Sequence, residues 1–165
     1  MEKNTTTQLL GMSVQVALAA WDMQNSRFLK LLDALTDEQL LSEIAPQKNT
    51  GVYLLGHLAA VHDYMLPLLG LGERLFPDLE APFLQKPDKS GFVFPPVAEL
   101  KSHYLAVNAA LAAGFAGLSP ENWFEKHTAV SDADFEKEPH RNRLNLLLNR
   151  TGHLAYHFGQ VALLK

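Results

Sequence analysis

Two histidines near the C-terminal end of the chain, His153 and His157, are four positions apart in the segment NRTGHLAYHFGQVALL, residues 149–164. In an α-helix, positions four apart lie roughly 40° apart around the axis and about 6 Å apart along it. Both imidazoles can therefore bind one ion from one helix face, as paired helical histidines do in metal sites. The spacing predicts part of a metal site, and a tight site needs a third ligand from elsewhere.

The third predicted ligand is His57, in the middle of the apolar segment LLGHLAAVH, residues 54–62. Gly56 would let another segment approach closely, and Tyr53 and Tyr64 share a helical stripe with His57, where they would form a polar-tipped pocket wall. His62 is five positions beyond His57, roughly 140° around the helix, so the two cannot bind the same ion. We expect the remaining histidines to lie at the surface or to be partly buried: His62, His103, His127 and His140.

Other interpretations of these histidines are open at this point. A single histidine on an apolar stripe, such as His57, often forms a hydrogen bond with a carbonyl group in a protein core, and short motifs also match by chance. If the metal site is real, the candidate catalytic residues are the polar side chains that share its stripes. These candidates are Tyr53, Tyr64, Asn149 and Gln160.

The elements that must position these residues are helices. Apolar residues recur at three- and four-residue steps, and no segment shows the alternation of a strand. We expect long helices at about residues 6–35, 51–69, 97–114 and 139–165, and short helical turns at TDEQ and LSPENW, where Thr36 with Gln39, and Ser119, provide caps. The first helix should bury the stripe Leu9, Met12, Val16, Ala20, Met23, Leu31 and Leu35.

Residues 70–96 are rich in glycine and proline and are too long for a simple helical hairpin. Such a crossover can return the chain along the bundle and leave the second and third helices parallel. The sequence therefore predicts an all-α fold, a four-helix bundle with one long crossover, as a single domain over residues 1–165.

Composition narrows the class of protein. A chain of 165 residues that is 47% hydrophobic can bury a sizeable core. With a net charge of −4 and scattered Lys and Arg, it lacks the basic surface that nucleic acid requires. Without cysteine it can form neither disulfides nor thiolate ligands. We find no signal peptide and no apolar segment approaching the roughly 20 residues of a membrane span, so we expect a cytoplasmic protein without a membrane partner.

Four segments, in order, resemble the DinB-like superfamily of bacterial helical-bundle proteins: LTDEQL, GHLAAVHDY, LSPENW and the terminal HLAYHFGQ. The resemblance covers essentially the whole chain. It implies a four-helix bundle in up-down-down-up order, often a homodimer, with one divalent ion bound by three histidines. Those histidines correspond here to His57, His153 and His157, and Gln160 matches the glutamine that follows them in the family.

The resemblance also implies a range of activities. Relatives include thiol S-transferases that use bacillithiol, mycothiol or glutathione, and a thiol-dependent maleylpyruvate isomerase. We therefore expect a metal-dependent enzyme that joins a low-molecular-weight thiol to a small electrophilic substrate. Zinc is the preferred ion, with nickel or iron as alternatives, because imidazole ligands do not select among these metals. The rival interpretations are a hydrolase that activates water and a metal-binding stress-response or interaction module without turnover.

Overall fold

The computed structural model describes residues 2–165, which are largely helical. Within this range the strand-like pairing is limited to two isolated bridges, between Glu43 and Thr50 and between Lys126 and Asn142. The all-α prediction is therefore confirmed. The elements follow one another in the order α1 (Glu2–Ala34), α2 (Asp37–Leu41), α3 (Gly51–Leu69), η1 (Pro77–Leu79), η2 (Ala81–Gln85), α4 (Val97–Ala116), η3 (Glu121–Phe124), α5 (Asp132–Lys137), α6 (Arg143–Val161) and η4 (Ala162–Leu164).

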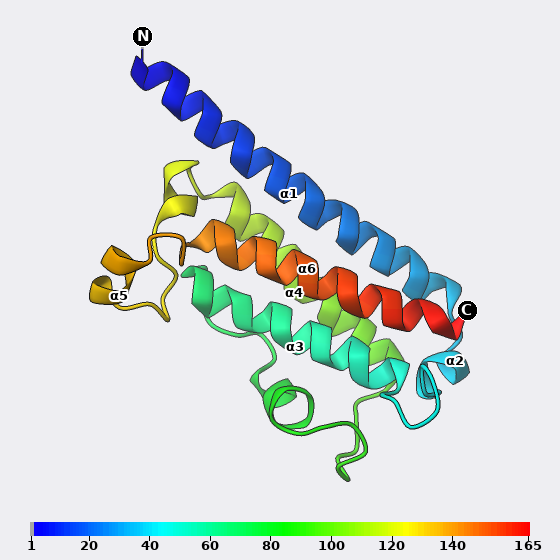
Figure 1. Ribbon diagram of the computed structural model, residues 1–165. Coiled ribbons are helices and arrows are strands. Elements are labelled where there is room, and N and C mark those ends of the chain that lie inside the picture. Colours follow the sequence, from blue (N-terminus) through cyan, green and yellow to red (C-terminus); the bar gives the residue numbers. More distant parts are fainter. Residues whose placement is uncertain (1) are drawn as a thin grey trace.

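The four longest helices, α1, α3, α4 and α6, lie alongside one another (Figure 1). α3 and α4 run in the same direction, and the crossover between them returns the chain to the end of the bundle at which α3 begins. α6 runs in the opposite direction to α3 and packs against both α1 and α3. The N-terminal turns of α1 project beyond the other helices. This arrangement places the first half of α3 beside the second half of α6.

Local sequence signals account for several helix ends. Thr36 forms the predicted capping box with Gln39, and the Thr50 side chain accepts a hydrogen bond from the Tyr53 amide at the start of α3. α3 ends at Gly70, whose φ of 71° lies in the left-handed region that glycine adopts without strain. α6 begins at Arg143 instead of the predicted Pro139, because the Asn142 side chain caps it. Shortly before α6, residues Asp132–Lys137 form the short helix α5, which the Ser131 side chain caps.

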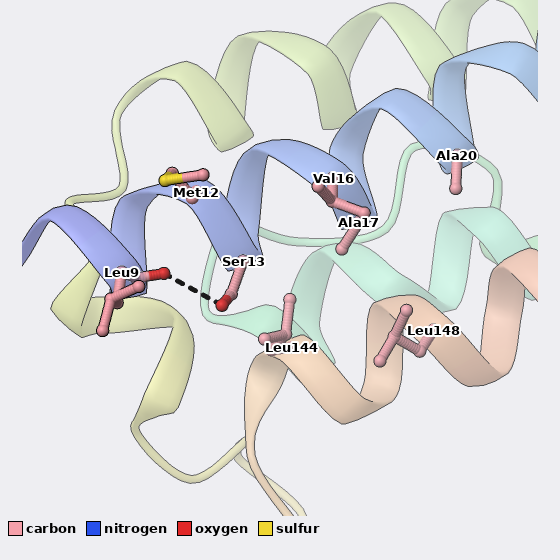
Figure 2. Close-up of a pocket in the computed structure, with 8 residues that line it drawn as sticks. All are labelled: Leu9, Met12, Ser13, Val16, Ala17, Ala20, Leu144 and Leu148. Atoms are coloured by element: carbon pink, nitrogen blue, oxygen red, sulfur yellow. Dashed lines mark hydrogen bonds between the residues drawn. The ribbon is translucent and has the colours of Figure 1, made fainter.

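The predicted apolar stripe of α1 is buried only in its C-terminal part. Leu31 and Leu35 are buried, but Met12 and Val16 are 62% and 72% exposed. Around Met12 and Val16 the buried face of α1 is instead the one that carries Trp21. α1 has apolar residues on both faces, and the face that carries the large indole ring, together with Val14 and Ala17, enters the core. The exposed stripe and α6 form an apolar groove of about 550 Å³ (Figure 2), lined by Leu9, Met12, Ser13, Val16, Ala17, Ala20, Leu144 and Leu148.

α3 is the central helix of the core, and most of its residues are buried. By length and composition alone it could cross a membrane, contrary to the expectation that no segment is apolar enough over that length. In the structure, 78% of its most apolar window is buried inside the protein. The high apolar content of α3 is therefore explained by packing against α4 and α6 and under the crossover.

His62 is fully buried, which corrects the expectation that it lies at the surface or is partly buried. Neighbouring elements cover the side of α3 on which it lies, so a residue turned away from His57 still enters the core. Its Nδ1–H donates to Oδ1 of Asn108 at 3.2 Å, and its ring packs against Trp21 with centroids 4.7 Å apart. Burial lowers the pKa of His62 to about 3, so the ring is neutral at neutral pH.

The buried neutral ring of His62 predicts a specific loss of stability in acid. Below the ordinary histidine pKa of 6.5 the unfolded chain binds a proton at His62 that the folded chain excludes until about pH 3. The free energy of unfolding should therefore decrease as the pH is lowered through this window, by up to about 1.4 kcal/mol per pH unit from this residue. His62→Phe should make the fall shallower, measured by urea unfolding at pH 7, 6, 5 and 4. Equal slopes for the two proteins would contradict this account.

Candidate metal centre

The imidazoles of His57 on α3 and of His153 and His157 on α6 converge between the two helices. The Nε2 atoms of His57 and His153 are 3.2 Å apart, and those of His157 and His153 are 3.0 Å apart. One ligand nitrogen from each ring lies within 4.8 Å of the other two. The structure thus brings together the three histidines predicted as ligands, although His57 and His153 are 96 positions apart in the sequence.

In two of these rings the Nδ1 atom, which points away from the cluster, donates a hydrogen bond to a carbonyl oxygen. Nδ1–H of His57 donates to the backbone oxygen of Phe83 at 2.8 Å, and Nδ1–H of His157 donates to Oε1 of Gln160 at 2.6 Å. A neutral imidazole carries a single N–H, so both rings direct an Nε2 lone pair into the cluster. His153 can supply one proton at most, which cannot satisfy both lone pairs well. A cation among the three Nε2 atoms would satisfy all of them, so these residues fit a divalent metal ion.

The electrostatic environment keeps the three rings neutral. Burial, together with the neighbouring His157, His57 and Arg150, lowers the pKa of His153 to about 4. Burial also lowers the pKa of His57, although the hydrogen bond with Phe83 acts in the opposite direction. It lowers the pKa of His157 as well, against the opposing effect of Gln160. The rings are therefore in the deprotonated state that metal binding requires near neutral pH.

Packing of the crossover against α3 fixes the position of His57. The Phe83 ring lies directly over Gly56: a Cβ at residue 56 would be 2.7 Å from Cδ1 of Phe83 and closer still to the ring edge. The Tyr53 ring stacks on His57 at an interplanar angle of 12°, and its hydroxyl donates to the backbone oxygen of Lys86 at 2.9 Å. Gly56 therefore permits the close approach that brings the Phe83 carbonyl to His57.

The four candidate catalytic residues lie in different environments. Tyr53 is buried beside His57, but Tyr64 is 43% exposed and packs against the Arg74 guanidinium, so the predicted wall of two tyrosines does not form. The two residues are three helical turns apart, which is too far for both rings to flank one cluster. Asn149 is exposed. Gln160 contacts His157 directly, as described above.

Two contributors to this site are not among the residues predicted from the sequence. The first is the Phe83 carbonyl, which leaves no trace in the sequence because every residue carries a backbone oxygen. The second is Arg150, whose charge acts on both His57 and His153. Arg150 had a usable signal, since it precedes His153 by three positions and so lies on the same face of α6.

The sequence profile of the DinB superfamily matches residues 20–161. The chain belongs to the DinB superfamily. The matched region includes all three clustered histidines of this DinB-superfamily protein, together with the crossover that supports them. Its fold is similar to a crystal structure of a conserved protein from Enterococcus faecalis, with a TM-score of 0.61 and 19% sequence identity over 90% of this chain and 92% of that chain. Comparison with curated proteins found no match.

The contact between Gly56 and Phe83 predicts the effect of adding one methyl group. Gly56→Ala should force the buried Phe83 ring to move and weaken its carbonyl contact with His57. Overpacking of this kind costs about 1–3 kcal/mol in the free energy of unfolding. Gly152→Ala is the matched control, because a Cβ at this helical position meets no atom within 4 Å. Urea denaturation should show a loss for Gly56→Ala and none for Gly152→Ala; equal effects would contradict the packing argument.

Proposed function

We propose that this DinB-superfamily protein is a metal-dependent enzyme whose single divalent ion is bound by His57, His153 and His157. The observation that supports this most directly is the convergence of three Nε2 atoms, two of which have their only proton on the opposite side of the ring. Zinc is the preferred ion, because imidazole ligands suit it and it is widely available, and nickel and iron are alternatives.

We also propose that the four long helices form an up-down-down-up bundle. In this order α3 and α6 are antiparallel neighbours, so residues early in α3 face residues late in α6. His57 then lies opposite the terminal pair without any special loop geometry. This order requires the long crossover between α3 and α4, and the crossover also supplies the carbonyl that orients His57.

The proposed activity is transfer of a low-molecular-weight thiol to a small electrophile. Three protein ligands are the arrangement of a catalytic site, since structural zinc sites are usually closed by four. When bound, the ion would act as a Lewis acid and lower the pKa of a thiol or water at its open position. The chain contains no cysteine, so a reacting thiol has to come from solution.

The residues of this chain would prepare the site for that chemistry. The Phe83 carbonyl and Gln160 fix the tautomers of His57 and His157, so that their Nε2 lone pairs face the ion. The Tyr53 ring lies nearly parallel to the His57 ring, with the two centroids 6.2 Å apart, and forms part of the surroundings of this ligand. The depressed pKa of His153 keeps that ligand deprotonated below neutral pH.

Metal binding is the first test of this proposal. Purified wild-type protein should bind one zinc ion per chain, measured by calorimetry and elemental analysis. His57→Ala, His153→Ala and His157→Ala should each weaken zinc binding at least about 100-fold, because two imidazoles rarely hold the ion tightly. His140→Ala, at an exposed position outside the cluster, is the control and should bind zinc normally. Unchanged zinc affinity in His153→Ala would refute the assigned ligand set.

Turnover is tested on the zinc-loaded protein with several low-molecular-weight thiols and a reactive chloroarene. A transferase consumes the chloroarene only when thiol is present: the thiol sulfur bonds to the ring carbon as the C–Cl bond breaks, which gives a thioether and releases chloride and a proton. Loss of the electrophile with water alone would identify the alternative, a hydrolase. The other alternative, a binding module without turnover, predicts no product and a fourth side chain completing the coordination of the ion.

We further propose that the expected homodimer forms through the exposed stripe of α1. Met12 and Val16 are largely exposed beside Leu148 of α6, and residues 4–20 contain no charged side chain. Two copies of this surface can therefore pack together without placing like charges in contact, as a two-fold interface requires. Val16→Glu should give a monomer by light scattering, whereas Ser26→Glu, also exposed on α1, should not. A wild-type monomer at micromolar concentration would refute this interface.

A further inference from the structure

Arg150 is a partly buried cation without a counter-ion. Its Nε atom is buried and has no hydrogen-bond partner among the described residues. No carboxylate lies within ion-pair distance of its guanidinium in residues 2–165. Partial desolvation of a charge is unfavourable unless pairing offsets it. A bound anion would give Arg150 the counter-ion that residues 2–165 do not supply.

The other four arginines of the chain each have a partner. Arg74 pairs with the buried Asp63 and with Glu80. Arg141 pairs with Glu138, and Arg143 pairs with Glu125. The fifth, Arg27, lies over the Phe158 ring, 5.0 Å from its centroid. Among the described residues Arg150 thus differs from the other four arginines in having neither a carboxylate nor an aromatic ring as a partner.

The position of Arg150 connects it to the histidine cluster. It precedes His153 by three residues, so the two side chains project from the same face of α6, with Cβ atoms about 5–6 Å apart. Among residues 2–165 no carboxylate forms an ion pair with Arg150 or with any of the three clustered histidines. The guanidinium therefore adds a positive charge without a counter-ion to the face of α6 that carries two of the candidate metal ligands.

We propose that Arg150 binds a carboxylate group of the small molecule that reacts at the histidine cluster. The inference rests on the proposed function and adds the substrate class: one of the two reactants, thiol or electrophile, is an organic anion. The guanidinium can hold a carboxylate through two parallel N–H···O bonds, which a lysine ammonium cannot reproduce. Because Arg150 lies one helical turn from His153, a molecule of only a few bonds can reach both the guanidinium and the cluster.

Matched ligand pairs test this proposal by calorimetry on zinc-loaded protein. One arm compares 3-mercaptopropionate with the neutral 3-mercaptopropanol, and the second compares 4-chloro-3-nitrobenzoate with 1-chloro-2-nitrobenzene. Wild type should bind the carboxylate member of one pair at least about 10-fold more tightly, which identifies whether the thiol or the electrophile carries the anion. Equal affinities within both pairs would overturn the proposal.

Variants of Arg150 separate its contribution from that of the ion. Arg150→Met should abolish the preference for the carboxylate while zinc stoichiometry stays at the wild-type value. Arg150→Lys, which retains the charge and is the safer variant for folding, should retain a reduced preference. Arg141→Met removes a partly exposed arginine that is paired with Glu138, and it should leave the preference intact. A carboxylate preference that persists in Arg150→Met would overturn the proposal.

Failure of the metal site would be distinguishable from failure of this inference. If wild type binds no zinc, the proposed function fails, and the inference is then tested on the metal-free protein with propionate and propionamide. Binding of propionate that is lost in Arg150→Met but kept in Arg141→Met would support an anion site at Arg150. No difference between propionate and propionamide would overturn it.

Discussion

Crowding of three neutral imidazoles is the constraint around which the rest of this structure is arranged. The Nε2 atoms of His57, His153 and His157 lie at hydrogen-bond distances, yet the protons of His57 and His157 point outward to Phe83 and Gln160. Lone pairs that face one another repel unless a proton or a cation lies between them. A cation among the three Nε2 atoms would remove this repulsion, so the packing of α3 against α6 brings together a group of imidazoles that could bind a metal ion.

The crossover serves this cluster because it is fastened to α3 at both of its ends. The buried carboxylate of Asp63 accepts hydrogen bonds from the backbone amides of Leu75 and Phe76 at 2.7 and 3.1 Å. Near the other end, Asp88 accepts from the backbone and hydroxyl of Thr50 at 2.6 and 2.9 Å. The intervening turn η2 is thereby held against α3, and its Phe83 carbonyl meets His57. Long loops are ordinarily mobile, but these anchors make this one part of the site.

Individual residues show where sequence patterns are sufficient and where they fail. Thr36, Thr50 and Gly70 act locally, so their roles as helix caps follow from their neighbours in the chain. Periodicity alone could not choose the buried face of α1, because both of its faces are apolar and the choice depends on the cavity that Trp21 fills. The same limit applies to His62, which helical angles exclude from the cluster but cannot place inside or outside the core.

The sequence by itself determined the helical class, the three histidines and the spacing that lets two of them share an ion, because these depend on periodicity and on residue chemistry within one helix. Only the tertiary structure decided that His57 meets the terminal pair, that a backbone carbonyl orients it, and that Arg150 is left without a counter-ion. Each of these depends on contacts between segments distant in sequence. Such contacts are set by how helices pack in three dimensions, which no local pattern encodes.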